Sequence, residues 1–154
     1  MPTSFKRLEL LEQQIHHAHR AAVIEELEKR GLREVNPLIL AMLKHVEQAG
    51  AESFSQRDLA RMLDISPAAV TNSLKTMEQK GYILRTPEEG DARRNRMALT
   101  DAGRGAVQGC EEAFSTVRKR MLEGFTHEEQ ELLAQFRERM LNNLRGTPGQ
   151  KEEG

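Results

Sequence analysis

The sequence is short of the residues that mark several classes of protein. It contains one cysteine and no tryptophan in 154 residues, and aromatic residues make up 4% of the chain. A single thiol forms no internal disulfide, so nothing indicates an oxidising compartment. The longest apolar stretch, near residues 37–43, is far shorter than a bilayer span, and charges interrupt the N-terminus too often for a secretory signal. These absences favour a soluble, cytoplasmic protein with no membrane partner.

Catalytic signatures are also missing from the sequence. None of the motifs GxGxxG, GxxxxGK, HExxH or GxSxG occurs, so the chain shows no phosphate loop, zinc-protease helix or nucleophile elbow. We therefore expect neither enzymatic activity nor a bound cofactor.

No sign of charge dominates the chain, but one segment is basic. The 23 lysines and arginines balance 24 acidic residues, giving a formal net charge of −1. Residues 53–99 hold 8 basic and 6 acidic side chains, and Arg93, Arg94 and Arg96 lie within four residues of one another. A basic patch on a nearly neutral protein indicates a polyanionic partner. A solvated charged loop explains the same pattern without any partner.

Capping residues and apolar spacing predict six helices. The first, from about Ser4 to Arg30, carries apolar residues at spacings of three and four and ends at Gly31. The capping residues that open the other five helices are Asn36, Ser55, Ser66, Thr100 and Thr126. Glycines at positions 50 and 81 are the expected ends of the second and fourth helices.

A β-hairpin is predicted between the fourth and fifth helices. Residues 82–86 read as one strand, 87–91 as a turn and 94–99 as the returning strand. The connection between Leu63 and Ser66 is so short that the third and fourth helices must cross steeply, as in a helix-turn-helix. A hairpin that follows a helix-turn-helix is a wing. The expected fold class is mostly α with a small β-hairpin, a winged helix-turn-helix flanked by N- and C-terminal dimerisation helices.

Apolar residues at both ends of the chain predict a homodimer. A winged-helix core does not cover the apolar stripe of the first helix together with the apolar residues of the last two helices, which are Cys110, Phe114, Val117, Leu133, Phe136 and Leu144. Such stripes most simply bury against a second copy. The expected parts are an N-terminal dimerisation helix (1–35), a DNA-binding winged helix-turn-helix (36–100), C-terminal dimerisation helices (101–145) and a disordered tail (146–154).

The fourth predicted helix has an apolar face and a polar face. Val70, Leu74 and Met77, at spacings of four and three, face the core. The candidate DNA-binding residues of this segment are Ser66, Pro67, Ala68, Thr71, Asn72 and Lys75. Asparagine can pair with an adenine edge, threonine can contact a thymine methyl or a phosphate, and lysine can contact a phosphate or guanine. An ordinary solvent-exposed helix face shows the same residue types.

The wing supplies the remaining candidates. Arg93, Arg94 and Arg96 follow its tip, where an arginine can enter a narrow, electronegative minor groove. The carboxylate of Asp91 would repel phosphates, so it does not fit a loop that only binds them. We interpret it as a wing-structuring residue that orients an arginine or supports the turn.

From residue 66 to 104 the sequence resembles the core of a winged-helix regulator of the multiple antibiotic resistance (MarR) family. The matching motifs are the step Val70-Thr71, Lys80-Gly81 before the strand, Asp91-x-Arg93 in the wing, and Leu99-Thr100-x-x-Gly103-Arg104. Each motif is weak alone, but the series at these spacings is specific. The family commonly has arginine after the Val-Thr step, where this chain has Asn72, so the family's usual base preference does not carry over to this chain.

The resemblance implies a homodimer that binds double-stranded DNA at a pseudo-palindromic operator. The recognition helix (66–80) would lie in the major groove, and the wing (86–97) would place Arg93 in the minor groove. The first helix and the last two would form the dimer interface. Members usually repress genes and release DNA when a small-molecule effector, a metal or an oxidant binds.

The sequence leaves the effector open. Glu12, His16 and His19 share one face of the first helix, with His17 beside them. Such a face could hold part of a metal site. A polar helix face is the simpler interpretation. Cys110 would be the sensor of an oxidant-responsive member, but its apolar position is typical of an inert core thiol. A winged helix that contacts only protein is the remaining alternative.

Overall fold

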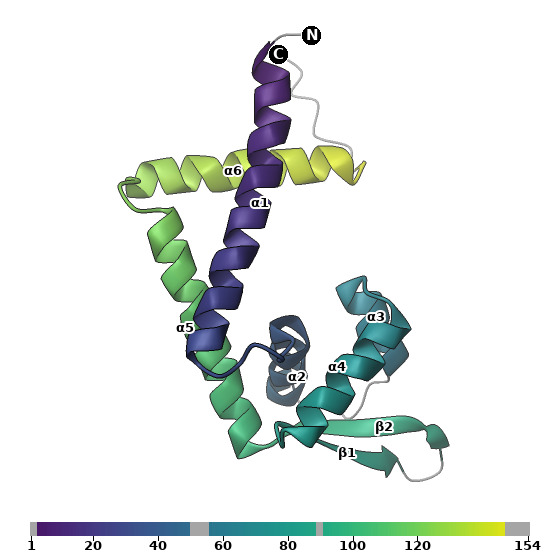
Figure 1. Ribbon diagram of the computed structural model, residues 1–154. Coiled ribbons are helices and arrows are strands. Elements are labelled where there is room, and N and C mark those ends of the chain that lie inside the picture. Colours follow the sequence, from purple (N-terminus) through teal and green to yellow (C-terminus); the bar gives the residue numbers. More distant parts are fainter. Residues whose placement is uncertain (1–2, 50–55, 89–90, 147–154) are drawn as a thin grey trace. The chain divides into compact units, whose positions relative to one another are not determined.

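The computed structural model describes residues 3–49, 56–88 and 91–146. Its elements are α1 (Thr3–Lys29), α2 (Pro37–Ala49), α3 (Gln56–Leu63), α4 (Pro67–Gln79), β1 (Ile83–Glu88), β2 (Asp91–Leu99), α5 (Asp101–Met121) and α6 (His127–Leu144) (Figure 1). This order confirms the mostly helical fold class with one small hairpin. The chain divides into two compact units, Met1–Val117 and Arg118–Gly154. No described helix is long and apolar enough to cross a membrane.

Side-chain caps begin two of the helices in the first unit, as the sequence predicts. The Asn36 Oδ1 accepts hydrogen bonds from the backbone N–H groups of Leu38 at 3.1 Å and Ile39 at 3.2 Å, at the start of α2. The Ser66 Oγ accepts from the N–H of Ala69 at 3.1 Å, at the start of α4. These bonds satisfy donors that a helix leaves unpaired in its first turn. Ser55 and Gly50, the other expected cap and helix end, lie outside the described residues.

A reciprocal capping box opens α6 in the second unit. The Thr126 Oγ1 accepts from the Glu129 N–H at 3.1 Å, and the Glu129 Oε1 accepts from the Thr126 N–H at 2.9 Å. The predicted capping box is therefore confirmed. The described chain ends at Gly146, so the expected disordered tail lies almost entirely outside the described residues.

The hairpin is longer than the sequence predicts. Residues 87–91 were expected to form its turn, but β1 continues to Glu88 and β2 begins at Asp91. The strands pair antiparallel, and the register shifts after Pro87, from Pro87 opposite Asn95 to Glu88 opposite Asp91. Proline has no N–H to give to the strand ladder, and inside sheets it is confined to edges and bulges. Pro87 therefore marks the irregularity within the wing rather than the end of its first strand.

One apolar core holds the first unit together. Among the described residues, no polar or charged residue is buried. The largest side chains with at most 1% exposure come from α2, α3, α4 and β1, and they are Ile39, Leu40, Leu59, Val70, Leu74, Met77 and Ile83. The C-terminal half of α1 and the first part of α5 join the same core. Cys110 and Val117, each 4% exposed, lie within it. The expectation that these two residues contribute to an uncovered surface is wrong, because other elements of the same chain cover them.

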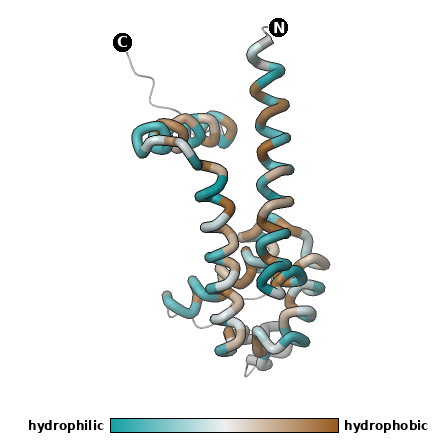
Figure 2. Tube along the Cα trace, turned by 60° about the vertical axis from the view of Figure 1, so that its left-hand side comes forward, coloured by the Kyte–Doolittle hydropathy of each residue, from teal (hydrophilic) through white to brown (hydrophobic). Residues whose placement is uncertain are grey.

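Other apolar residues remain exposed in each unit. Figure 2 shows hydrophobic positions, in brown, along α1 and α6. On α1 the exposed ones are Leu8, Leu10, Leu11, Ile15 and Ile24. In the second unit they are Met121, Phe125, Leu132, Phe136, Met140, Leu141 and Leu144. Exposed apolar surface of this extent is costly to leave in water.

Candidate nucleic-acid interface

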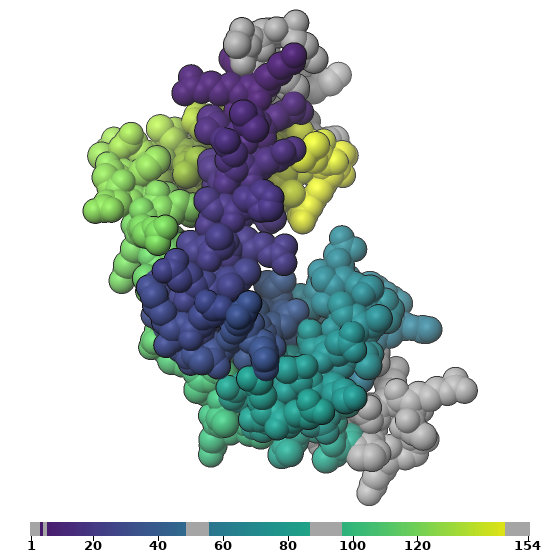
Figure 3. Space-filling model, in the orientation of Figure 1, coloured from purple at the N-terminus to yellow at the C-terminus, as the bar shows by residue number. Residues whose placement is uncertain are grey.

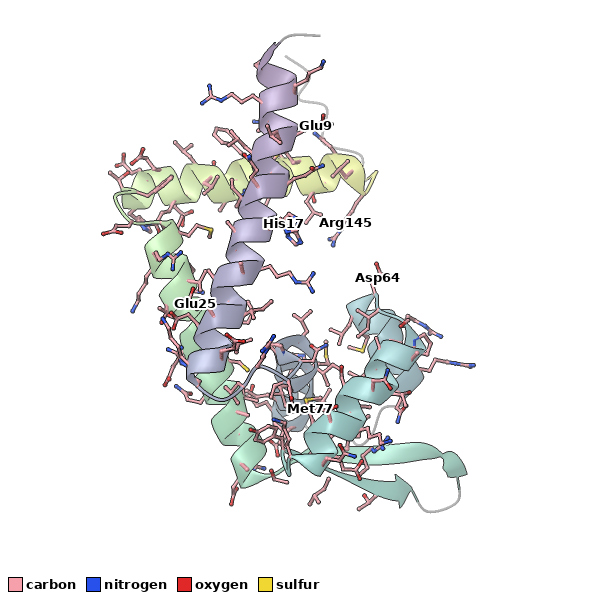
Figure 4. All side chains as sticks on the ribbon, in the orientation of Figure 1. Glu9, His17, Glu25, Asp64, Met77 and Arg145 are labelled. Carbon is pink, nitrogen blue, oxygen red and sulfur yellow. The ribbon has the colours of Figure 1, made fainter. Side chains whose placement is uncertain are left out.

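Helix α4 separates its apolar and polar residues cleanly. Val70, Leu74 and Met77 are fully buried, at 0% exposure, and Figure 4 shows Met77 pointing from α4 toward α2. This burial confirms the predicted core face. It fixes the rotation of α4 about its own axis, so the opposite face of the helix must point to solvent.

The predicted recognition residues all lie on the exposed part of this segment. Ala68, Thr71, Asn72 and Lys75 are exposed, and their spacing of three, four and seven residues from Ala68 places them on one face. Ser66 and Pro67 are also exposed, where the helix begins. Side chains of α3 and α4 form one continuous surface in the space-filling view (Figure 3). A face with small residues at its start can enter a major groove closely.

Two of these side chains have no polar partner among the described residues. The carboxamide of Asn72 makes no hydrogen bond to any described residue, and it offers both donors and an acceptor. Lys75 forms no ion pair within the described part of the chain. An amide of this kind can pair with the donor and acceptor edge of adenine, whereas the ammonium group suits a phosphate or guanine.

The side-chain hydroxyl of Thr71 already has hydrogen-bond partners within the protein. Its Oγ1 lies 3.0 Å from the Pro67 carbonyl oxygen, one turn earlier in α4, and 3.1 Å from the Oε1 of Gln56. Gln56 is the first residue of α3 and is half-buried. No local pattern in the sequence marks Gln56, because its contact with Thr71 joins residues 15 positions apart in two different helices.

A left-handed residue shapes the turn between α3 and α4. Asp64 has φ of 52°, and the Ile65 N–H donates to the Ala60 carbonyl at 3.1 Å, which closes the end of α3. Figure 4 shows Asp64 at the tip of this turn. Ile65 is partly buried and packs against the apolar core. The tight turn sets the crossing of the two helices.

The wing is tied to the recognition helix at its base. Gly81, with φ of 79°, ends α4, and the Tyr82 N–H donates to the Met77 carbonyl at 2.9 Å. The Arg85 Nε on β1 lies 2.8 Å from the Glu78 Oε2 in the last turn of α4. These bonds hold the start of the hairpin in one position relative to α4.

The structure places the wing candidates on β2. Asp91, Arg93, Arg94 and Arg96 all belong to this strand, with Arg96 opposite Thr86 in the register. The side chains of residues 87–96 lie outside the described part of the chain. The proposed roles of these residues therefore remain predictions.

The motif Leu99-Thr100-x-x-Gly103-Arg104 joins the wing to α5. The Thr100 Oγ1 donates to the Gly81 carbonyl at 2.6 Å and accepts from the Gly103 N–H at 3.0 Å, so one hydroxyl both caps α5 and holds the end of α4. A Cβ at Gly103 would overlap the Tyr82 carbonyl oxygen. Only glycine permits this close approach. Thr100 is thereby confirmed as the cap of α5.

Arg104 completes this junction by linking α5 to α2. Its guanidinium pairs with Glu47 on α2 and, at 3.0 Å, with Asp101 in the first turn of α5. The hydrogen bond that its guanidinium donates to Glu47, together with the negative charge of that side chain, raises the pKa of Arg104, so the guanidinium is charged at any physiological pH. A second pair, Lys44 with Glu111 at 2.8 Å, joins the same two helices.

The candidate sensor residues show no assembled site. The described residues contain no group of three His, Cys, Asp or Glu side chains that could hold a metal ion. His19 instead lies against the ring of Phe114, with 6.3 Å between the ring centroids. Burial raises the pKa of Cys110 to about 11, with a further contribution from the charge of Glu111. A protonated, buried thiol is a poor nucleophile, in keeping with an inert core residue.

Known proteins resemble the chain in sequence and in structure. Residues 38–94 match the model of the MarR family. The HTH-type transcriptional regulator YdgJ of Bacillus subtilis is 33% identical over 114 residues, which are 74% of this chain and 66% of YdgJ, just under two thirds of its length. The transcriptional regulator PA3341 is similar in structure, with a TM-score of 0.67, 26% identity, and coverage of 90% of this chain and 98% of that one. A MepR mutant of S. aureus gives a TM-score of 0.70 at 25% identity, covering 88% and 97% of the two chains.

The helix order, the buried and exposed faces of α4 and the hairpin tied to its end define a winged helix-turn-helix. The chain belongs to the MarR family.

Proposed function

We propose that the chain is a dimeric, sequence-specific DNA-binding regulator that represses transcription. The observation that carries this proposal is the exposed face of α4, where Ala68, Thr71, Asn72 and Lys75 lie together above a fully buried opposite face. Small residues at its start let the backbone approach the major groove, and its amide and ammonium groups suit base edges and phosphates.

The wing provides the second contact with DNA. Three arginines on β2 follow the hairpin tip, and the base of the hairpin is bonded to the end of α4. We assign Arg93 to the minor groove beside the recognition helix, with Arg94 and Arg96 near the phosphates. Asp91 structures the wing. A mutant of the similar protein MepR from S. aureus has been solved bound to an oligodeoxyribonucleotide.

Exposed apolar surfaces support the dimer. The α1 residues Leu8, Leu11 and Ile15, and Phe136 of α6, each have at least 40% of their surface exposed in the single chain. A two-fold axis would bury these surfaces against their copies and present two recognition helices to a pseudo-palindromic operator. For adjacent half-sites the helices would lie roughly 34–36 Å apart, one turn of duplex.

Regulation completes the proposal. As the family resemblance implies, a small-molecule effector would release the dimer from DNA, and the chain would act on cytoplasmic DNA without catalysing a reaction. Every other element of the proposal requires that the dimer binds DNA, so DNA binding is tested first.

The test compares two arginine variants on a duplex from the promoter region of the chain's own gene. Arg93→Ala should weaken binding by about 1–3 kcal/mol in a fluorescence-anisotropy titration. Arg33→Ala removes the same charge between α1 and α2, where Arg33 pairs with Glu28 at 3.0 Å, and should bind like the wild type. Equal affinity of Arg93→Ala and the wild type would show the wing assignment to be wrong. Failure of all three proteins to distinguish this duplex from a scrambled one would favour a winged helix that contacts protein.

A further inference from the structure

The junction between the wing and α5 also holds the end of the recognition helix. Building on the proposed function, we infer that Thr100 is a positioning residue: its hydroxyl binds the end of α4 to the start of α5 and so sets the separation of the two recognition helices in the dimer. The half-site spacing that the dimer accepts follows from that bond. Thr100 itself touches no DNA and acts through α4.

One side-chain oxygen joins the end of α4 to the start of α5. The Thr100 Oγ1 donates to the Gly81 carbonyl oxygen at 2.6 Å and accepts from the Gly103 N–H at 3.0 Å. A hydroxyl has one proton and two lone pairs, so it makes both bonds at once. The Thr100 N–H also donates to the Tyr82 carbonyl oxygen at 3.1 Å. Two successive carbonyls after α4 are therefore held by the residue that caps α5.

The segment that Thr100 holds is fixed to α4 by further backbone bonds. Gly81 has φ of 79°, and the N–H groups of Gly81 and Tyr82 donate to the carbonyls of Glu78 at 3.0 Å and Met77 at 2.9 Å. Such bonds close the end of a helix in a defined geometry. A displacement of this segment is therefore a displacement of the end of α4.

Ion pairs at this junction are weaker ties. Arg104 with Glu47 joins α5 to α2 rather than to α4. Lys80 with Glu34, at 2.9 Å, reaches the end of α4 from the segment after α1, and these two side chains are 35% and 64% exposed. Exposed pairs contribute little, because water and salt screen them. The bond from Thr100 instead joins a neutral, half-buried side chain to the backbone itself.

In a two-fold dimer, the position of α4 relative to the dimer surface decides where the second recognition helix lies. In sequence, α5 leads from this junction to α6 of the proposed interface, and α1 shares the core of the winged helix. One added base pair moves a half-site by about 3.4 Å along the duplex and turns it by about 35°. A dimer with fixed recognition helices rejects this change, whereas a dimer with a loose junction tolerates it.

Thr100→Asp separates the positioning role from helix capping. The new carboxylate still accepts from the Gly103 N–H, and its charge suits the start of a helix. It has no proton for the Gly81 carbonyl at neutral pH and repels that oxygen instead. Thr126→Asp makes the same change at the cap of α6, where the hydroxyl accepts from the Glu129 N–H, and is the matched control. Thr100→Ser keeps the hydroxyl and should behave like the wild type.

The first measurement uses the full chain and the duplex that the wild type enriches from a pool of randomised duplexes. Versions of this duplex with one base pair added or removed between the half-sites are titrated beside it. Wild type, Thr100→Ser and Thr126→Asp should lose on the order of tenfold in affinity for each change of spacing. Thr100→Asp should distinguish the spacings by less than about threefold. All four proteins should bind a single half-site alike, because the exposed face of α4 is unchanged.

The second measurement tests the same inference without DNA. A nitroxide label on Gln79→Cys, at the exposed end of α4, reports the distance between the two recognition helices by double electron–electron resonance. Cys110 is buried and should stay unlabelled. Thr100→Asp should shift or broaden this distance distribution, and Thr126→Asp should not. Thr100→Ala, which removes the hydroxyl without adding a charge, should act in the same direction, and thermal melts would show that each variant folds.

The outcomes distinguish the inference from the proposed function. A folded Thr100→Asp that keeps the spacing preference or the distance distribution of the wild type would overturn the role of Thr100 and leave the regulator intact. An equal change in Thr126→Asp would overturn it as well, since the effect would then not depend on the junction. A wild type that enriches no duplex or gives no distance between protomers would overturn both.

Discussion

At the scale of single residues, Gly103 is the described glycine with the least space for a side chain. A methyl group at this position would overlap the backbone carbonyl oxygen of Tyr82, and a backbone atom at the junction of α4, β1 and α5 has little room to move. The neighbouring Gly105 has open space around its own position. The two glycines lie in the same helix turn and so form a matched pair.

Gly103→Ala should destabilise the fold by about 3 kcal/mol, the upper end of the usual cost of overpacking, because the clash forces the hairpin away from α5. Gly105→Ala should stabilise it by about 0.5–1 kcal/mol, since alanine is the better helix former. Urea unfolding followed by circular dichroism measures both. A Gly103→Ala protein as stable as Gly105→Ala would contradict the close approach seen here.

The thiol of Cys110 should behave as a buried, protonated group. Its pKa of about 11 lies above the value in the unfolded chain, where the thiol is exposed to water. The stability that this burial contributes is therefore fully present below about pH 9 and lost as pH rises toward 11. In the folded protein iodoacetamide should react slowly at pH 8 and rapidly only after urea is added. The loss of stability between pH 9 and 11 should be smaller in Cys110→Ala; rapid native alkylation would show that the thiol is accessible.

At the scale of elements, local signals explain most of what the sequence predicts correctly. Caps at Asn36, Ser66 and Thr126 and the glycine after α4 act within one helical turn, so their effect can be read from neighbouring residues. The buried stripe of α4 follows from its spacing alone. The pairing of Gln56 with Thr71 joins two elements, and no local pattern encodes it.

Two other departures have the same physical origin. The extent of the wing depends on a register shift at Pro87, which only the partner strand reveals. The burial of Cys110 and Val117 depends on how many helices cover α5, which spacing along one helix does not report. The exposed position of the recognition residues could be predicted, whereas the assignment of the wing side chains stays a prediction.

The turn between α3 and α4 offers a test at the same scale. Asp64 adopts φ of 52°, a region that costs most residues roughly 1 kcal/mol and costs glycine little. Asp64→Gly should therefore raise the stability by up to about 1 kcal/mol, and Asp64→Val should lower it by more, because a β-branched side chain is strained there. Thermal melts of the two variants beside the wild type measure the difference. Equal stability in Asp64→Val would show that the turn does not require this conformation.

At the scale of the whole molecule, the proposed dimer would cover the exposed apolar residues of α1 and α6. Phe136 on α6 has 52% of its surface exposed in the single chain. Phe136→Glu should weaken the dimer by placing a charge in an apolar interface, and the adjacent Gln135→Glu, with an equal charge change, should not. Sedimentation velocity over a dilution series measures the dissociation of each variant. A wild type that sediments as a monomer at every concentration would refute the dimer.

The most direct test of the proposed regulator is the binding of wild-type chain to DNA. A labelled duplex from its promoter region and a scrambled duplex of equal length would be titrated by fluorescence anisotropy at two salt concentrations. We predict tight binding to the promoter duplex with two protomers per site, and an affinity that falls steeply with salt as phosphate contacts release counterions. Equal and weak binding to both duplexes would contradict a sequence-specific role for α4 and the wing.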